Sequence, residues 1–407
     1  MSLDSIFTHV NKAPVIEVFA LSDLFKKDNH PSKVNLTVGA YRDDAGKPYV
    51  LPVVRKAEER ILANEALNKE YLPITGLPEF CQKAIELLLG KDNEFILTKR
   101  CDGIQALGGT GALYICLNFL RTVMKFDNVA VSQPTWPNHK GMSLSLGYKV
   151  FDYCYWDKEN KVVAFDEMVK SLKSLPDKTV VILHASAHNP TGMDLSQEQW
   201  KEIVTVIKEK SLFPLIDIAY QGFASGDLDK DSWIIRHLAE RNFEFLIAQS
   251  FSKNFGLYNE RVGNAVIITK DAKATELVKD QMKVIVRKTW SNPPDHGARI
   301  VQTILTDSQL FEEWKNSIRT MSGRIIEMRE KLYKALTEIN TLGDWKHIIQ
   351  QSGMFSYTGL TEKHAQQLKD EFHIYMLSDG RINMCGLNHS NITYVANAIN
   401  SVLQNSQ

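Results

Sequence analysis

The sequence has 407 residues, 44% of them hydrophobic and 24% charged, and its 48 lysine and arginine residues equal its 48 aspartate and glutamate residues. This composition is typical of a soluble globular protein whose core is large enough for one large and one smaller domain. The balanced charge gives no indication of a nucleic-acid or anionic-membrane partner, although it is compatible with small anionic ligands.

The five cysteines form no C-x-x-C pair and are odd in number. This pattern disfavours both a zinc site and a disulfide framework, and it favours reduced thiols. The amino terminus lacks the apolar core of a signal peptide and the arginine bias of an organelle presequence, and no apolar run reaches membrane-spanning length. We therefore expect a cytoplasmic protein with no membrane partner.

Strand-like segments alternate with helical patterns over much of the chain, which predicts an α/β fold with a mostly parallel sheet covered by helices. The expected strands are residues 128–133, 148–153, 179–185, 213–219, 243–249 and 263–269, and the clearest helical patterns are 110–126, 196–210 and 231–241.

From about residue 307 the pattern changes to a long charged helix over 308–338, followed by strand-like pieces around 352–357 and 381–385. We expect this part to form a second domain together with the start of the chain. The predicted division is a large domain over residues 45–307 and a smaller α/β domain of residues 1–44 and 308–407, which includes an amino-terminal arm.

Two early segments contain candidate ligand contacts. The apolar stretch Val34–Arg42 contains Gly39, and a glycine suits a place where the backbone approaches a ligand closely, with a plain turn as the alternative. Tyr71 precedes a loop rich in proline and glycine, where a tyrosine more often packs or lies on the surface.

A glycine-rich run, Gly108–Gly111, comes directly before an apolar helical pattern and includes Gly109 and Thr110. Bare N–H groups at the amino end of a helix favour a phosphate, so this run is a candidate phosphate cradle. It is not a P-loop, because no G-K-[ST] follows. It is not a dinucleotide fingerprint, because Tyr114 replaces the third glycine of G-x-G-x-x-G.

Aromatic and amide side chains follow two of the expected strands. Trp136 offers a flat face for stacking an aromatic ring, although a tryptophan that caps the sheet is an equally good interpretation. Asn189 precedes a proline and is therefore held extended, with its amide able to donate into a crevice. His184 and His188 are four residues apart, but they lack the helix and the glutamate of H-E-x-x-H, so no metal site is expected.

Asp217 lies inside the apolar strand 213–219, where a carboxylate is costly unless it meets a cation. A protonated pyridine nitrogen is such a cation, and a ring kept protonated in this way acts as an electron sink. Tyr220 follows the same strand and can hydrogen-bond an oxygen of the same ligand.

Lys253 lies at the exit of strand 243–249 with Ser250 and Ser252 beside it, and Arg261 follows eight residues later. Desolvation and a neighbouring cation both favour the neutral amine, which attacks carbonyls to form a Schiff base. The planar fork of Arg261 suits two phosphate oxygens. A solvated loop lysine is the ordinary alternative, whereas an S-x-x-K acylation site is disfavoured because no S-D-N or K-T-G follows.

The segment SFSKNFGLYNERVGN around Lys253 resembles the cofactor-lysine segment of the aspartate aminotransferases, pyridoxal 5'-phosphate (PLP) enzymes of fold type I. Further stretches from VNLTVGAYRD to GRINMCGL agree in the same order, so the resemblance covers nearly the whole chain. It implies a PLP cofactor and a homodimer with shared active sites.

The resemblance also implies residue roles. Lys253 would hold PLP and shuttle a proton, Asp217 would face the ring nitrogen with His139 behind it, and Tyr220 would contact the phenolic oxygen. The implied cofactor contacts are completed by Gly109, Thr110, Trp136, Asn189, Ser250, Ser252, Arg261 and, from the other subunit, Tyr71. The implied substrate contacts are Gly39, Trp136, Asn189, Arg381 for the α-carboxylate, and Arg287 for the side-chain carboxylate across the dimer interface.

This chain departs from the family at Gly108, where the family usually carries a serine. One hydroxyl donor to the phosphate is therefore missing, and Gly108→Ser is expected to tighten PLP retention by about one hydrogen bond, on the order of 0.5–1.5 kcal/mol.

The expected reaction is the reversible transfer of an amino group between L-aspartate and 2-oxoglutarate, which gives oxaloacetate and L-glutamate, so the ligands are small dicarboxylic amino and keto acids. One alternative is the same scaffold acting on aromatic or kynurenine-type amino acids, or as a β-lyase. Arg287 disfavours an apolar preference, although dual-specificity members can keep this arginine. A non-catalytic binding protein is the other alternative, and the intact Lys253, Asp217 and Arg381 disfavour it.

Overall fold

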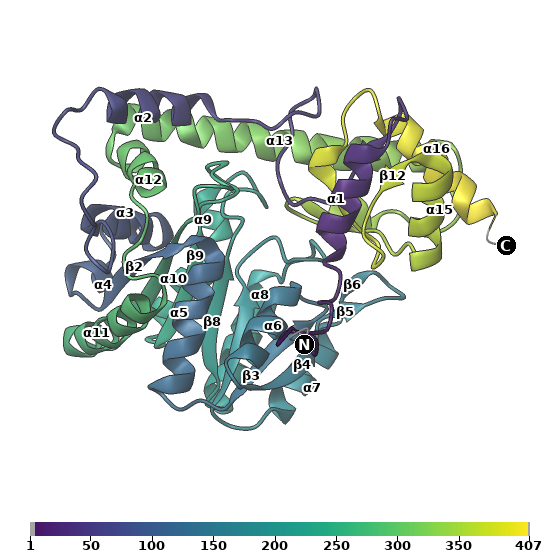
Figure 1. Cartoon of the computed structure of the whole chain (residues 1–407). Helices are drawn as coiled ribbons and strands as arrows, with labels where there is room; N and C mark the ends of the chain where they lie inside the picture. The colour runs from purple at the N-terminus through teal and green to yellow at the C-terminus, as the bar shows by residue number, and fades with distance from the viewer. Residues whose placement is uncertain (1–4, 406–407) are drawn as a thin grey trace.

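The computed structural model describes residues 5–405, and its centre is a seven-stranded sheet between two layers of helices (Figure 1). In spatial order the strands are β2 (Cys101–Leu107), β10 (Val262–Ile268), β9 (Phe245–Ser250), β8 (Phe213–Ile218), β7 (Thr179–His184), β3 (Asn128–Gln133) and β4 (Lys149–Cys154). Strand β10 is antiparallel to both neighbours, and the other neighbouring pairs are parallel. The predicted α/β class with a mostly parallel sheet is confirmed.

Both faces of the sheet are buried. On β7, Val180 and Ile182 belong to one apolar core, whereas Val181 and Leu183 belong to the core on the opposite face. This alternation is that of a strand covered by helices on both sides. One face is covered by α5 (Gly108–Thr122) and α11 (Ala272–Thr289), and the other by α3 (Pro78–Leu89), α7 (Phe165–Ser174), α8 (Gln197–Glu209) and α10 (Trp233–Glu240).

The predicted strands of this sheet all form, with ends that differ from the prediction by at most two residues. Strand β2 was not predicted, because Asp102, Gly103 and Gln105 interrupt its apolar pattern. The helix predicted over 231–241 is α10, which is two residues shorter at its start, and the short helix α9 (Leu228–Asp231) precedes it, separated by Ser232.

The predicted helix over 308–338 is α13 (Ser308–Glu338). It begins where the Asp307 carboxylate accepts a hydrogen bond from the Leu310 N–H at 2.9 Å, which satisfies one free donor of the first turn. Its buried side chains recur every three or four residues from Leu310 through Trp314 to Leu336, so one face stays apolar along the whole length. Figure 1 shows α13 running from α2 (Pro52–Leu62) and α12 (His296–Thr306) to the group that contains α1 and α16.

The elements after α13 lie beside the start of the chain. Strand β1 (Val34–Asn35) pairs in parallel with β12 (Ile374–Tyr375), and β11 (Phe355–Tyr357) pairs with β13 (Arg381–Asn383). The strand-like pieces predicted near 352–357 and 381–385 are β11 and β13, both shorter than expected. The helices in this group are α1 (Glu17–Lys27), α14 (His347–Gln350), α15 (Glu362–Phe372), α16 (Ile392–Gln404) and the 3₁₀ helix Met384–Gly386.

Short elements complete the fold: α4 (Glu94–Leu97), α6 (Pro137–Ser145), β5 (Trp156–Asp157) and β6 (Val162–Val163). Among residues 5–405, none of the helices combines the length and the apolar character needed to span a bilayer.

A buried arginine on α13 organises the segment that leads into β11. Arg329 is 2% exposed, and its guanidinium donates to the carbonyl oxygens of Ile348 at 3.0 Å, Ser352 at 3.1 Å, Gly353 at 2.8 Å and Phe355 at 2.5 Å. Burial lowers its pKa to about 9. Four carbonyl groups that would otherwise lack donors therefore depend on one side chain.

Arg329→Met is expected to lower the free energy of unfolding by about 3 kcal/mol or more, because these buried carbonyl oxygens lose their donor. Denaturant unfolding of the variant measures this loss. Arg319→Met is the control, since Arg319 is exposed on the same helix and bonds only Asn316 in the described chain, and it should change the value by no more than about 0.5 kcal/mol. Equal losses in the two variants would contradict the expectation.

Candidate active site

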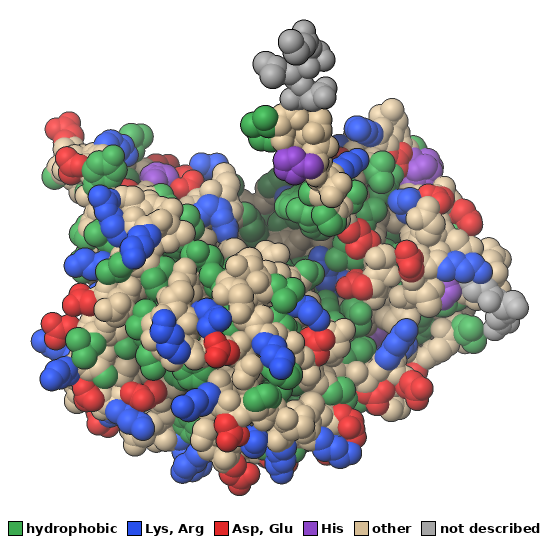
Figure 2. Space-filling model, turned by 60° about the horizontal axis from the view of Figure 1, so that its bottom comes forward, with side chains coloured by type: hydrophobic (Ala, Val, Ile, Leu, Met, Phe, Trp, Pro, Cys, Tyr) green, Lys and Arg blue, Asp and Glu red, His purple; other side chains and the backbone are tan. Residues whose placement is uncertain are grey.

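A cavity of about 260 Å³ lies where β7, β8 and β9 end, between these strand ends, the start of α5 and β13. The space-filling view shows the surface hollowed near the centre of the molecule (Figure 2). The residues of the cavity wall that were predicted from the sequence are Gly39, Gly109, Thr110, Trp136, Asn189, Asp217, Tyr220, Ser250, Ser252, Lys253, Arg261 and Arg381.

The sheet topology explains why these residues meet. Strands β7, β8 and β9 are parallel, so their carboxyl ends lie at one edge of the sheet. Strand β10 is antiparallel to β9 and therefore begins at the same edge. The loop between β9 and β10 leaves and re-enters the sheet there, which places both Lys253 and Arg261 at the cavity.

One end of the cavity is built to receive an anion. Arg261 donates to the Ser252 hydroxyl at 3.2 Å and to the carbonyl oxygens of Tyr258 at 3.1 Å and Leu107 at 3.5 Å, all of them neutral groups. The hydroxyls of Thr110 and Ser250 belong to the same wall. A guanidinium without a carboxylate partner, beside hydroxyl donors, is suited to a phosphate.

The glycines at the start of α5 let the backbone approach these groups. A Cβ atom at Gly109 would lie 2.9 Å from the Ser250 Cβ atom, and one at Gly108 would lie 2.6 Å from Nη2 of Arg261. Gly108 also has a φ of +68°, which side chains rarely adopt. The Gly108 N–H donates to the Arg261 carbonyl oxygen at 3.0 Å, so the N–H groups that follow it at the start of α5 are the ones placed to bind the same anion as the Arg261 side chain.

The opposite end contains a buried carboxylate. Asp217 is 9% exposed, and its Oδ2 accepts a hydrogen bond from Nε2 of His139 at 2.8 Å. Burial raises the pKa of Asp217, but the hydrogen bond from His139, the nearby imidazoles of His139 and His184 and the charge of Lys253 together outweigh burial and hold the pKa below its ordinary value. The carboxylate is therefore ionised at neutral pH and can face a cationic ring nitrogen.

A chain of hydrogen bonds lies behind Asp217. The Asn189 backbone N–H donates to Nδ1 of His184 at 3.2 Å, and burial, aided by the neighbouring His139, lowers the pKa of His184 to about 3. His184 is therefore neutral with its hydrogen on Nε2, which faces the Thr135 hydroxyl at 3.4 Å. The same hydroxyl lies 2.9 Å from Nδ1 of His139; toward a neutral His139 it donates to this nitrogen, which leaves the His139 hydrogen on Nε2, directed at Asp217.

His139 was predicted behind Asp217, whereas Thr135 and His184 were not predicted as site residues. Their signal in the sequence was available, because both lie within a few residues of Trp136 and Asn189 in segments that were already considered.

Lys253 lies between the two ends of the cavity. Its Nζ is 5.2 Å from the centre of the Tyr220 ring. Burial lowers the pKa of Lys253 to about 8, helped by the charges of Arg261 and Arg381 and opposed by that of Asp217. A substantial fraction of the amine is therefore uncharged near neutral pH, as a nucleophile for carbonyls requires.

Arg381 forms a second cationic position. Its guanidinium donates to Oδ1 of Asn189 at 3.2 Å and to the Thr37 carbonyl at 3.1 Å, and it lies 4.1 Å from the centre of the Phe355 ring. Its Nε atom is buried without a hydrogen-bond partner in the described chain. Gly39 gives this ring room, since a Cβ atom there would lie 2.8 Å from Phe355. The arrangement suits a carboxylate ligand.

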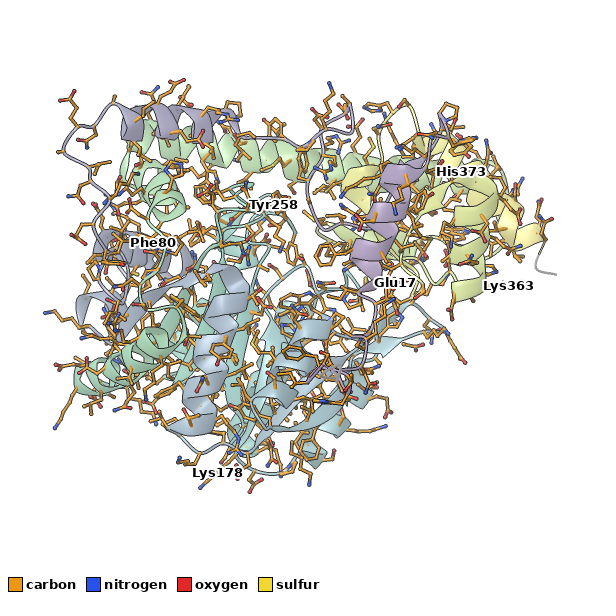
Figure 3. The ribbon with its side chains drawn as sticks, viewed as in Figure 1. Glu17, Phe80, Lys178, Tyr258, Lys363 and His373 are labelled. Carbon is orange, nitrogen blue, oxygen red and sulfur yellow. The ribbon has the colours of Figure 1, made fainter. Side chains whose placement is uncertain are left out.

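The cavity wall also contains residues that sequence reasoning missed, among them Val18, Phe19, Tyr258 and Phe355. Figure 3 labels Tyr258 below α13, where its hydroxyl oxygen accepts a hydrogen bond from the Tyr41 N–H at 2.8 Å. Tyr258 stands between Lys253 and Arg261 in the sequence, and this position was the available signal.

Two of the predicted residues, Tyr71 and Arg287, do not line this cavity. Tyr71 is 83% exposed, and Arg287 is exposed at the end of α11, where it donates to the Ser291 hydroxyl. Both side chains therefore lie on the outside of the chain.

The family model of aminotransferases of class I and II matches residues 31–399. The cytoplasmic aspartate aminotransferase of Gallus gallus is 49% identical, with 99% of each chain covered. A solved aromatic-amino-acid aminotransferase from Burkholderia pseudomallei, covalently bound to pyridoxal phosphate, is 41% identical with a TM-score of 0.95 over 98% of this chain and 100% of that one. The aspartate aminotransferase from the cytoplasm of Saccharomyces cerevisiae is 38% identical with a TM-score of 0.96 over 99% of each chain.

The pKa of Lys253 leads to a direct test. In the ligand-free protein, trapping of a small aldehyde on Lys253 by borohydride should increase with pH with a midpoint of about 8. Asp217→Asn should move this midpoint lower, because the Asp217 charge favours the ammonium form. Peptide mapping of the trapped product across a pH series measures both midpoints, and a midpoint near the ordinary value of 10.5 would contradict the assignment.

Proposed function

This chain belongs to the class I and II aminotransferases, and from that membership we propose that it is a PLP-dependent aspartate aminotransferase. It transfers the amino group between L-aspartate and 2-oxoglutarate, giving oxaloacetate and L-glutamate, and it acts in the cytoplasm. The observation that carries this proposal is the position of Lys253 between a buried carboxylate, Asp217, and the guanidinium of Arg261, which has no carboxylate partner among residues 5–405.

The cavity fits PLP by the chemistry of its donors and acceptors. The cradle of Arg261, Ser252 and the start of α5 offers cationic and N–H donors for a phosphate, and Asp217 offers an anion for a protonated ring nitrogen. When bound, PLP supplies an aldehyde for linkage to amines and a ring that withdraws electrons from the substrate. Trp136 provides an apolar face for that ring.

The side chains of this protein then have distinct tasks. The Lys253 amine would hold the cofactor and, once displaced, would take the proton from the substrate α-carbon, which its pKa of about 8 permits, and deliver it to the cofactor carbon that had carried the aldehyde. Asp217 would keep the ring nitrogen protonated. Arg381 would bind the α-carboxylate, with Asn189 and Gly39 beside it. Tyr220 and Asn189 would supply the hydrogen-bond donors for the phenolic oxygen.

The proposed assembly is a homodimer in which each chain completes the neighbouring site. Tyr71 and Arg287 lie outside their own cavity, so Tyr71 is available to another copy as a phosphate contact and Arg287 as a carboxylate contact.

The amino-terminal segment also exposes apolar side chains, including Ile6 at 77% and Phe7 at 68%, and Figure 2 shows this segment projecting from the body. Exposed apolar residues of this kind favour a protein interface. We also propose that residues 45–307 form the large domain and that residues 1–44 together with 308–407 form the smaller one.

Arg287→Ala tests the substrate. Removing one partner of a desolvated charge pair costs roughly 2–5 kcal/mol, so kcat/KM for aspartate should decrease by roughly thirty-fold to several thousand-fold. Alanine and aromatic donors should lose far less, because they offer no side-chain carboxylate. A donor panel with 2-oxoglutarate measures the ratio, and a wild-type enzyme that prefers aromatic donors would support the alternative function.

Mixing Lys253→Ala chains with Arg287→Ala chains tests the shared site. Each hybrid dimer should contain one cavity with a native lysine and a native arginine, so aspartate activity should reappear after subunit exchange. Inactive hybrids, once their formation is confirmed, would rule out the cross-subunit role of Arg287.

The structure reverses the expectation for Gly108→Ser. A Cβ atom there would displace Arg261, and the φ of +68° adds strain of about 1–2 kcal/mol for a residue with a side chain. Because a displaced Arg261 would lose a charge-assisted hydrogen bond to the phosphate, PLP retention in Gly108→Ser should be weaker by roughly tenfold or more, measured by equilibrium dialysis. Gly108→Ala carries the same Cβ atom without the hydroxyl and serves as control. Tighter retention in Gly108→Ser than in the wild type would restore the original expectation.

A further inference from the structure

The two exposed residues Tyr71 and Arg287 are connected within one chain. Arg287 donates to the Ser291 hydroxyl, which in turn donates to Oδ1 of Asn292 at 2.7 Å. Nδ2 of Asn292 donates to the carbonyl oxygen of Leu72 at 2.7 Å. Hydrogen bonds therefore run without interruption from the Arg287 guanidinium to the residue next to Tyr71.

Gln105 on β2 lies beneath both loops and holds each of them. It is 1% exposed, its Oε1 accepts a hydrogen bond from the Leu77 N–H at 3.0 Å, and its Nε2 donates to the Pro294 carbonyl at 2.6 Å. Its backbone N–H also donates to the Thr75 carbonyl at 3.0 Å. Because β2 is the edge strand of the sheet, the loop that carries Tyr71 covers this edge.

The contact between the loop and Gln105 leaves no spare room. A Cβ atom at Gly76 would lie 2.1 Å from the Cβ atom of Gln105. Gly76 has a φ of +88°, so the turn that follows Tyr71 rests directly on this side chain.

The side chain at this position must satisfy both loops at once. One loop presents an N–H group and the other a carbonyl oxygen, so the side chain between them must accept and donate. A glutamine does both while remaining neutral at every pH, whereas an ionised glutamate only accepts and a methionine forms neither normal hydrogen bond. Loss of either bond leaves a buried backbone group without a partner.

We propose that Gln105 is a positioning residue that fixes Tyr71 and Arg287 as a single unit for the neighbouring subunit's active site. A change at Gln105 then alters two separate properties together, PLP retention through Tyr71 and dicarboxylate preference through Arg287. Both changes occur in the neighbour's site and not in the site of the altered chain. This inference rests on the proposed dimeric aspartate aminotransferase.

Gln105→Met keeps the length of the side chain and removes both of its hydrogen bonds. In the homodimer of this variant we expect at least about a tenfold decrease in kcat/KM for aspartate relative to an aromatic donor, the size that follows from about 1.4 kcal/mol. The decrease should appear mainly in KM, and PLP should be lost faster during dialysis. A normal preference ratio with normal PLP retention would overturn the proposal.

Heterodimers with two different affinity tags show which site Gln105 serves. In the first heterodimer, a Gln105→Met chain is paired with a Lys253→Ala chain. The only site with Lys253 then receives Tyr71 and Arg287 from the chain with native Gln105, so its ratio of aspartate to aromatic activity should be that of the wild type. In the second heterodimer, a wild-type chain is paired with a chain that carries both Gln105→Met and Lys253→Ala. The only site with Lys253 then receives Tyr71 and Arg287 from the altered chain and should show the reduced ratio.

The opposite result in these two heterodimers, or impairment in both, would overturn the proposal, because Gln105 would then act in its own site or only on general stability. Failure of the proposed function would be recognised by different results. A Lys253→Ala homodimer that stays active, or Lys253→Ala and Arg287→Ala hybrids that do not recover, would show it independently of Gln105.

Two further variants separate positioning from stability. Gln105→Glu keeps the acceptor for Leu77 and regains a donor toward Pro294 only when protonated, so its preference ratio should improve as the pH falls, relative to the wild type at the same pH. Gln105→Glu also replaces Gln105→Met in these measurements if the methionine variant does not fold.

Gln249→Met is the matched control, since Gln249 is 1% exposed on β9 and its Nε2 donates to the Ala84 carbonyl at 3.0 Å. It should lower stability and keep the wild-type ratio, and a reduced ratio there would overturn the proposal.

Discussion

The site depends on keeping the carboxylate of Asp217 ionised inside an apolar strand. Burial opposes the charge, since an unpaired carboxylate in a protein interior costs several kcal/mol. The hydrogen bond from His139 and the surrounding positive charge offset this cost and lower the pKa. The neighbouring strand β7 supplies His184, and the segment from the end of β3 into α6 supplies Thr135 and His139, so the order of strands in the sheet and the charge of the site are parts of one arrangement.

The cationic side of the site has the complementary design. Arg261 and Arg381 each bond neutral oxygens of the described chain, so their charges remain available to a ligand in the cavity. These unpaired charges also favour the neutral form of Lys253, whereas Asp217 favours its ammonium form. A ligand with a phosphate at one end, a carboxylate at the other and a basic ring nitrogen near Asp217 would complete all three interactions. Because the donors are held in place before the ligand arrives, little reorganisation is needed on binding.

Much of the fold and of the candidate site could be predicted from the sequence where a residue contradicted the pattern around it. Asp217 stands out because it interrupts an apolar strand, and Lys253 because it follows one. Strand β2 was missed for the converse reason, since its polar residues obscure the strand pattern although Gln105 is buried by contacts with loops nearly thirty and nearly two hundred residues away. The clash that weighs against Gly108→Ser could not be predicted, because neither a backbone angle nor the approach of Arg261 is visible in a sequence.

The hydrogen-bond chain from Asn189 to Asp217 has one further consequence. With His139 neutral, every donor in it points the same way, and its first donor is a backbone amide, which does not ionise in the physiological range. Dipoles aligned in this way reinforce one another. In this arrangement the far end of the chain has no titratable proton to offer Asp217. The neutral His184 therefore acts on the carboxylate as a fixed dipole and not as a group that responds to the pH of the solvent.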